Sequence, residues 1–409
     1  MFDKLTKIYG KVGRNAKVLI ATEPLWSIPM NWVFFYRPIF LSIVIGLSSV
    51  EIGLLITVFN ILSSILPLLG GYLADRFGRK RVFMLFDSVC WLSSLALWMI
   101  SQNIWLALLA YIIESATSLT YSIWECLLVE DTKLELRALV YSSISAIFRV
   151  GSLTMPVAGY IIGFFDLDLG CRILFALAFC AMVPMFILRQ IYLREPEIGR
   201  IVRKDKVFSG FKGYLNSLSL IKRDPILPAL LLIFVMIGFY NSSYAYFPLY
   251  LVDDNGLGLN EETASFIPSL SSAVSLFLLL LVVPRLKSKN SYFKALILGY
   301  SLGSLAILLL INSPAGFMPL ALFSALLLGF YYVVAFSVSR TFLMNQIDFV
   351  DSKARAKITS IAATLSSLVN LPTPTIAGYL FSLNPKLFLT AILTTFIASI
   401  LILLISKKD

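Results

Sequence analysis

The chain has 409 residues, of which 58% are hydrophobic and 14% are charged, and its formal net charge is +11. About a quarter of the residues are charged in an average soluble domain, so this composition excludes a single soluble core. The continuous apolar runs argue against a β-barrel, whose short strands alternate apolar and polar residues. The chain contains no histidine, which excludes a histidine metal site or proton relay. The four cysteines have no ligand-like spacing, and we expect neither a metal nor a cofactor.

Long apolar segments follow one another along almost the whole chain. A spanning helix needs about 20 apolar residues and satisfies its own backbone hydrogen bonds, which lipid cannot do. The sequence therefore predicts an all-α membrane protein with twelve transmembrane helices. In chain order they cover residues 18–45, 50–73, 82–102, 104–129, 138–164, 170–192, 226–251, 262–284, 291–311, 316–344, 356–381 and 386–406. A polar, basic tract over residues 193–225 separates a first bundle, residues 1–192, from a second, residues 226–409.

Lysine and arginine collect in alternate gaps between these helices, including the N-terminal segment, residues 76–81 and the central tract. The opposite gaps carry mainly carboxylates, such as Asp166 and Asp253. Because cytoplasmic loops hold the excess of lysine and arginine, we expect a multi-pass protein of the cell membrane with both termini in the cytoplasm. The cations lie in many separate gaps, so we expect no nucleic-acid partner.

The two halves repeat each other. A shift of 210 residues places Asn31 on Asn241 and Pro38 on Pro248. Later, "RALVYSSISAIFRVGSLTMPVAGY" matches "RAKITSIAATLSSLVNLPTPTIAGY" with one extra residue. Parallel repeats of six helices are a transporter architecture, with the substrate site near mid-membrane at the interface of the repeats. The sequence thus predicts two pseudo-symmetric six-helix bundles.

The stretch "GYLADRFGRK" lies between the second and third predicted helices. It resembles the loop signature G-x-L-x-D-R-x-G-R-K of the major facilitator superfamily (MFS). The resemblance covers the whole chain, which resembles the prokaryotic multidrug and metabolite members of that family. It implies the MFS fold and a gate on the cytoplasmic side. The gating residues that it implies are Gly71, Asp75, Arg76, Gly78 and Arg79.

Two glycines of this loop have expected physical roles. Gly71 would allow close approach of backbones where helices cross, and Gly78 would adopt the positive φ of a sharp turn. The alternative to a gate is that the loop only fixes the topology by its positive charge.

The fourth predicted helix carries a polar stripe at helical spacing on an otherwise apolar segment. We expect the stripe to line an interior cavity, which agrees with the resemblance, since helices one, four, seven and ten line the cavity in the family. The alternative is a helix-packing seam, because serine and threonine also serve close packing. The stripe consists of Glu114, Thr117, Ser118, Tyr121, Ser122 and Glu125.

An ionisable side chain inside the membrane is costly and is a functional candidate. We expect an ion pair between Glu114 and Arg149, both near mid-membrane, which either is fixed or is competed for by substrate or a proton. Glu125 and Arg340 occupy equivalent places in the repeat, and we expect them to meet as an inner gate.

Other residues are candidates for proton coupling and substrate contact. Asp87 is expected to be a structural partner of the nearby loop cations. The predicted proton carriers are Glu23, Glu114 and Glu125. The predicted substrate contacts are Asn31, Phe34, Glu114, Ser118, Tyr121, Tyr240, Asn241, Tyr244 and Tyr332.

The sequence contains no P-loop, so an ion gradient or the substrate's own gradient remains as the driving force. The leading hypothesis is a secondary transporter that exports a small organic molecule by alternating access with proton coupling. The alternatives are an uptake symporter or uniporter for a nutrient or metabolite, and a membrane sensor or scaffold that does not transport. An enzyme is not expected, because the usual catalytic sets are missing. The expected partners are the substrate, the lipid bilayer and protons, and we expect a monomer.

Overall fold

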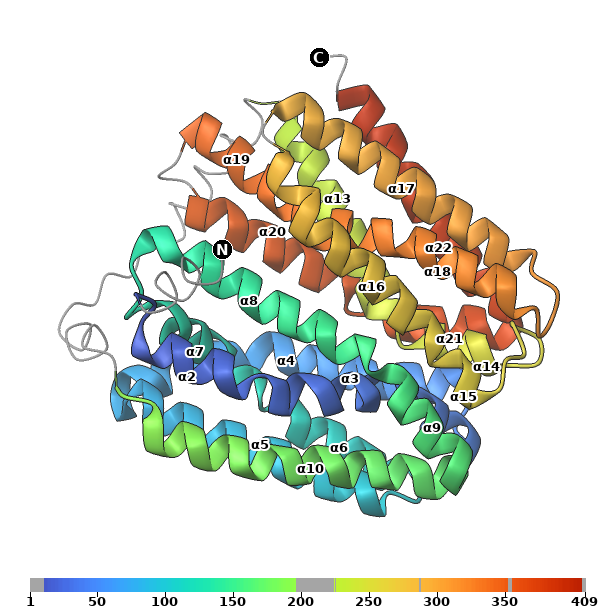
Figure 1. Ribbon diagram of the computed structural model, residues 1–409, viewed down its shortest axis with the longest axis horizontal. Coiled ribbons are helices and arrows are strands. Elements are labelled where there is room, and N and C mark those ends of the chain that lie inside the picture. Colours follow the sequence, from blue (N-terminus) through green and yellow to red (C-terminus); the bar gives the residue numbers. More distant parts are fainter. Residues whose placement is uncertain (1–10, 196–223, 225, 287, 352–354, 407–409) are drawn as a thin grey trace. The chain divides into compact units, whose positions relative to one another are not determined.

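The computed structural model describes residues 11–195, 224, 226–286, 288–351 and 355–406, and every regular element in these ranges is a helix. The chain divides into two compact units (Figure 1). The first contains residues 1–47, 55–154 and 160–207, and the second contains residues 48–54, 155–159 and 208–409. The bundle bounds predicted from the sequence stay a prediction, because most of the tract between residues 193 and 225 lies outside the described residues.

In the first unit, α10 packs against α3 and α5, α5 packs against α6 and α7, and α3 packs against α8. The ring of Trp98 lies 5.0 Å from that of Tyr111 and 6.1 Å from that of Phe175, in a fully buried aromatic core. The helices of the first half are α2 (Arg14–Thr22), α3 (Pro24–Ile39), the π-helix η1 (Phe40–Val44), α4 (Ser49–Phe77), α5 (Arg79–Ile100), α6 (Ile104–Ser115), α7 (Ser118–Val129), α8 (Leu134–Leu153), α9 (Met155–Phe165) and α10 (Leu167–Tyr192).

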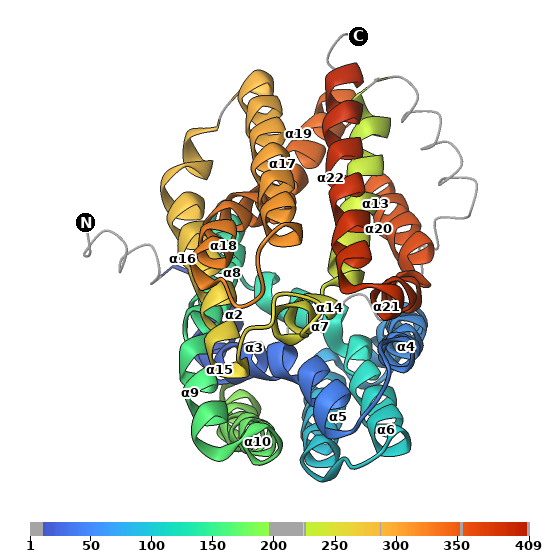
Figure 2. The same ribbon diagram turned by 90° about the vertical axis from the view of Figure 1, so that its right-hand side faces the viewer.

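In the second unit, α18 packs against α16 and α17, and α22 lies beside α13 and α17 (Figure 2). The helices are α13 (Ile226–Ser243), α14 (Tyr246–Val252), α15 (Glu261–Ala264), α16 (Phe266–Leu281), the 3₁₀-helix η3 (Val283–Arg285), α17 (Lys289–Ile311), α18 (Met318–Val333), the π-helix η4 (Val334–Val338), α19 (Ser339–Asp351), α20 (Arg355–Asn370), α21 (Thr373–Leu383) and α22 (Pro385–Ser406).

Ten helical stretches in the described ranges are long and apolar enough to cross a membrane. They correspond to the second to tenth and the twelfth of the predicted spans. The first and eleventh predicted spans are helical but interrupted, as α2–α3–η1 and α20–α21. None of α2, α3, α20 and α21 exceeds 16 residues, which is short of the length that a straight helix needs to span the bilayer.

The fourth predicted helix, 104–129, is not continuous, and α6 ends before α7 begins. At the break, the backbone N–H groups of Ala116 and Thr117 bond to the carbonyls of Ile113 and Glu114, three residues back. The hydroxyls of Thr117 and Thr120 also donate to carbonyls three residues back. Threonine side chains that compete for backbone carbonyls bend helices. The polar stripe therefore does not follow one straight helix face.

The fifth and eleventh predicted helices are also interrupted, and proline is the cause. α9 restarts with Pro156 in its first turn, and α21 restarts with Pro374 in its first turn. Proline has no N–H and clashes with the preceding turn inside a helix, but it is favourable at a helix start. Both prolines fall in the matched segments of the internal repeat. Each half of the chain therefore has a helix restart at an equivalent place.

The close backbone approach expected at Gly71 occurs at its neighbour. A Cβ on Gly70 would lie 2.0 Å from the carbonyl oxygen of Leu119 in α7, whereas a Cβ on Gly71 would meet nothing within 4 Å. Within the first unit, Gly71 therefore makes no close packing contact, because helix rotation turns the other glycine of the pair toward α7.

We predict that Gly70→Ala lowers the thermal unfolding temperature of the detergent-purified protein, because overpacking of this kind costs about 1–3 kcal/mol. Gly71→Ala is the matched control. It adds the same methyl group to open space and gains about 0.5–1 kcal/mol of helix preference. A Gly70→Ala variant as stable as the Gly71→Ala variant would contradict the contact.

Candidate functional site

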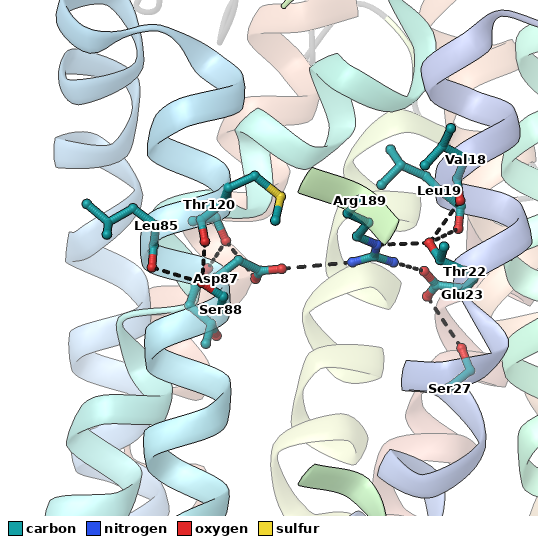
Figure 3. A network of polar contacts seen from close by, with 12 residues as sticks. Val18, Leu19, Thr22, Glu23, Ser27, Leu85, Asp87, Ser88, Thr120 and Arg189 are labelled. Carbon is teal, nitrogen blue, oxygen red and sulfur yellow. Dashed lines mark hydrogen bonds and ion pairs between the residues drawn. The ribbon is translucent and has the colours of Figure 1, made fainter. Parts of the chain in front are cut away.

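Arg189, near the C-terminal end of α10, joins three parts of the first unit (Figure 3). Its Nη2 lies 3.1 Å from Oε2 of Glu23, at the junction of α2 and α3. Its Nη1 lies 3.9 Å from Oδ2 of Asp87 on α5. Its Nε donates to Oγ1 of Thr22 at 3.0 Å. We call Arg189, Glu23 and Asp87 the Arg189 site.

The two carboxylates of the Arg189 site have further hydrogen-bond donors (Figure 3). Ser27 donates its hydroxyl to Oε1 of Glu23 at 3.4 Å, and Thr120 of α7 shares its one hydroxyl proton between Oδ1 of Asp87 at 3.1 Å and the carbonyl of Thr117. The three charged side chains are 4% to 10% exposed. The helix restart at Pro24 and the bend before α7 thus supply groups that fix the two carboxylates around one guanidinium.

The Arg189 site contains two acidic groups and one permanent cation. A buried charge without a partner is costly, because the interior cannot replace the water that it loses. With both carboxylates ionised the three charged side chains carry one net negative charge, and with one proton bound they are balanced. The site can therefore hold a proton at a place that α2, α3, α5 and α10 all contact.

The sequence predicted part of this site. Glu23, named there as a candidate proton carrier, is buried and accepts a hydrogen bond from Arg189, and its role in proton coupling stays a prediction. The interpretation of Asp87 as a partner of loop cations is wrong, since its cation is Arg189 on α10. Arg189 was missed, because it lies three residues before the end of a predicted helix and resembles an ordinary helix-end cation. The available signal was that it still lies within the predicted span 170–192.

A second buried ion pair joins α3 to α6. Arg37 Nη1 lies 2.6 Å from Oε2 of Glu114, and the Nε1 of Trp98 donates to the same oxygen at 3.2 Å. The guanidinium carbon of Arg37 lies 4.7 Å from the ring centre of Tyr111 and 5.2 Å from that of Trp98. Aromatic faces attract a desolvated cation. The rings and the carboxylate therefore both stabilise the buried guanidinium of Arg37.

This pair bears on the predicted roles of Glu114. The structure gives Glu114 a partner, Arg37, that the sequence did not assign to it. The predicted pair of Glu114 with Arg149 stays a prediction. Glu125 is half-buried in the first unit, and Arg340 is exposed in the second unit. The predicted contact between them stays a prediction.

The loop between α4 and α5 begins α5 with a sharp turn. Gly78 has φ +97°, which confirms the predicted positive φ. The carboxylate of Glu195 accepts from the backbone N–H groups of Arg79 and Lys80 at 2.7 and 2.8 Å and so caps α5. The side chain of Arg79 pairs with Glu130, which follows α7.

The other gating residues are placed less fully. Arg76 donates to the hydroxyl of Tyr72 at 3.2 Å, one turn back on α4. The side chain of Asp75 lies outside the described part of the structure, and the gating roles stay predictions. The structure shows that Arg79 and Lys80, which follow the turn, have their partners within the first unit.

Four predicted substrate contacts besides Glu114 belong to the first unit. The amide nitrogen of Asn31 donates to the carbonyl of Ser27 on its own helix at 2.6 Å and to that of Phe148 on α8 at 3.3 Å, so one of these bonds joins α3 to α8. Phe34 and Ser118 are half-buried, and Tyr121 is 59% exposed. Tyr121 has a surface available to a ligand, whereas the amide nitrogen of Asn31 is already bonded to carbonyls.

Three predicted contacts in the second unit lie together. The hydroxyl of Tyr240 on α13 donates to that of Tyr332 on α18 at 2.8 Å. The ring of Tyr244 lies 5.9 Å from that of Tyr240 and 6.4 Å from that of Tyr332. Asn241 is exposed. The structure thus brings the three tyrosines into one cluster, with Asn241 on an accessible part of α13.

Helices long and apolar enough to span a membrane in two units, with charged side chains paired inside one of them, define a multi-pass membrane protein. The family model of the Major Facilitator Superfamily matches residues 27–371, so the chain belongs to this superfamily, whose members are transporters and not enzymes.

Comparison with known proteins gives relatives at low identity. "Uncharacterized MFS-type transporter YqjV" of Bacillus subtilis (strain 168) is 28% identical over 132 residues, which is 31% of this chain and 31% of that protein. The crystal structure of the nucleoside transporter NupG has a TM-score of 0.70 at 14% identity and covers 96% of this chain and 98% of that chain. That of the POT family transporter PepTSo has a TM-score of 0.66 at 14% identity, covering 97% and 98%. Such identities show the fold alone.

We predict that Arg189→Met lowers the thermal unfolding temperature strongly, because loss of one partner of a buried ion pair costs about 3–5 kcal/mol. Adding Glu23→Gln and Asp87→Asn to Arg189→Met removes the stranded charges and recovers much of the loss. Asp168→Asn is the control, since it breaks the exposed pair with Arg172, which is worth about 0–1 kcal/mol. An Arg189→Met effect no larger than that of the control would contradict the site.

Proposed function

We propose that the chain exports a small organic molecule across the cell membrane by alternating access and couples this export to protons. The observation that carries the proton coupling is the 2:1 ratio of carboxylates to cations in the Arg189 site. The excess of lysine and arginine in alternate gaps supports a cytoplasmic location of both termini.

The charge ratio distinguishes the two buried ionic sites. At the second, one carboxylate, Glu114, faces one guanidinium, Arg37, and the charges are already balanced. In the Arg189 site, Glu23 and Asp87 share one cation, so a proton can bind and leave without stranding the arginine. We therefore assign the proton to Glu23 and Asp87 as a pair, and a supporting electrostatic role to Glu114.

Contact of the Arg189 site with several helices supports coupling. Arg189 is held by groups from the α2–α3 junction and from α5, and Asp87 is held by a hydroxyl from α7. A change in charge there alters contacts of several helices at once, which is what a coupling site needs in order to favour one state of the transporter.

The predicted substrate contacts complete the proposal. In the first unit, Phe34, Ser118 and Tyr121 offer aromatic and hydroxyl surface, and in the second unit Asn241 and the tyrosine cluster offer the same chemistry. Such a set suits an uncharged or weakly charged organic molecule with aromatic and hydrogen-bonding groups. Uptake by symport, or passive uniport, is the alternative, because the buried carboxylates alone do not specify a direction.

We predict that a ligand found by thermal-shift screening of the purified protein accumulates in proteoliposomes whose lumen is acidic, because proton exit then drives substrate entry. The measurement is flux with a pH gradient imposed in either direction. Accumulation driven by an acidic bath would replace the antiport proposal with symport, and flux independent of both gradients would indicate a uniporter.

We predict that Glu23→Gln and Asp87→Asn each remove gradient-driven accumulation of that ligand but keep its gradient-free exchange across the membrane. Neutral side chains keep most hydrogen bonds of the site and remove its proton. Asp168→Asn, which neutralises an exposed carboxylate of the same unit, serves as the control and keeps both activities. If both Glu23→Gln and Asp87→Asn still accumulate the ligand, the Arg189 site does not carry the proton.

For the proposed inner gate, we predict that exchange of the two charges, Glu125→Arg with Arg340→Glu, preserves flux better than either neutral variant. An ion pair works with its charges in either order, whereas a single neutralisation removes it. Flux is compared for the exchange and for Glu125→Gln and Arg340→Gln. Equal loss in all three variants would argue against a gate between these residues.

A further inference from the structure

The first unit has a groove of about 960 Å³ between the beginning of α5 and the end of α10. On α5 its wall runs from Arg81 to Ser88, and on α10 it includes Ile187 and Ile191. The seven steps from Arg81 to Ser88 correspond to about 10 Å along the helix. The groove lies on membrane-spanning helices and shares no side chain with the Arg189 site.

The end of the groove next to the Gly78 turn is cationic. Lys80 and Arg81 both line it. Glu195 also lines this end, and both its oxygens accept from backbone N–H groups at the start of α5, so the three charged side chains together carry one net positive charge. Lys80 donates to the carbonyl of Gln190 at 2.8 Å, which holds its ammonium at the groove. Arg81 is exposed, and among the described residues it has no hydrogen-bond or ion-pair partner.

The other part of the groove is apolar and open. Leu85 is 58% exposed, Ile187 is 54% exposed and Ile191 is 61% exposed, and all three lie within candidate membrane spans. Exposed aliphatic side chains on a spanning helix are suited to contact hydrocarbon. The groove therefore has two cations at one end and an aliphatic wall along the rest. A phospholipid has the matching order, an anionic phosphate followed by acyl chains.

We propose that this groove binds one anionic phospholipid, with its phosphate against Lys80 and Arg81 and its acyl chains along Leu85 and Ile187. Basic pockets between transmembrane helices, next to a lipid leaflet, recognise anionic headgroups. The headgroup is the occupant that fits, because a soluble anion would leave the aliphatic wall without a partner. This inference is independent of the proposed transport activity.

The test is native mass spectrometry of the full chain with phosphatidylglycerol and, separately, with phosphatidylethanolamine. We expect phosphatidylglycerol, the anionic lipid, to bind more tightly. The double variant Lys80→Gln/Arg81→Gln is expected to weaken its binding about thirtyfold, because each cation near the membrane surface raises the affinity about fivefold. Ile187→Trp narrows the groove without changing charge and is expected to weaken binding as well.

The matched control is Arg285→Gln/Lys289→Gln, which removes the same charge from exposed positions after α16. It is expected to leave binding of phosphatidylglycerol unchanged. Equal binding of the two lipids, equal weakening by the control pair, or full binding by Ile187→Trp would each overturn the proposal. Size-exclusion profiles and thermal unfolding temperatures like those of the unsubstituted protein establish that the variants are folded.

Discussion

The cost of leaving a charge unpaired away from water governs where the ionisable side chains of the first unit lie. Arg189 is held by two carboxylates, and Arg37 is held by one carboxylate and several aromatic rings. Each arrangement joins helices that are distant in sequence, since Arg189 and Glu23 are 166 residues apart. These pairs therefore tie the bundle together and, at the Arg189 site, leave it with a charge that one proton balances.

The turn at Gly78 shows the same constraint at the edge of the membrane. Glu195 follows α10 and caps α5, and Glu130 follows α7 and pairs with Arg79. The ends of α5, α7 and α10 are therefore held by one loop. This arrangement binds Arg79 and Lys80 inside the unit and leaves Arg81 at the mouth of a groove, so the loop has a structural role whatever its part in gating.

Interruptions of the helices bring the polar groups to these positions. The restart at Pro24 lies beside Glu23, and the threonine-rich bend before α7 precedes Thr120, whose hydroxyl bonds to Asp87. The proline restarts of α9 and α21 occupy equivalent places in the repeat, so the two halves share this irregularity as well as their sequence pattern. The breaks are specific to particular residues, and each has a local chemical cause.

The sequence by itself determined the properties that depend on local chemistry. Apolar length predicted nearly all the spans, the glycine at position 78 predicted its positive φ, and the loop motif predicted the superfamily. Only the tertiary structure decided which charges meet. A rotation of one helix by one residue replaces Gly71 by Gly70 at the contact with α7. In the same way, helix rotation and crossing bring Arg37 to Glu114 and Arg189 to Asp87, and no local pattern contains that information because the partners belong to different helices.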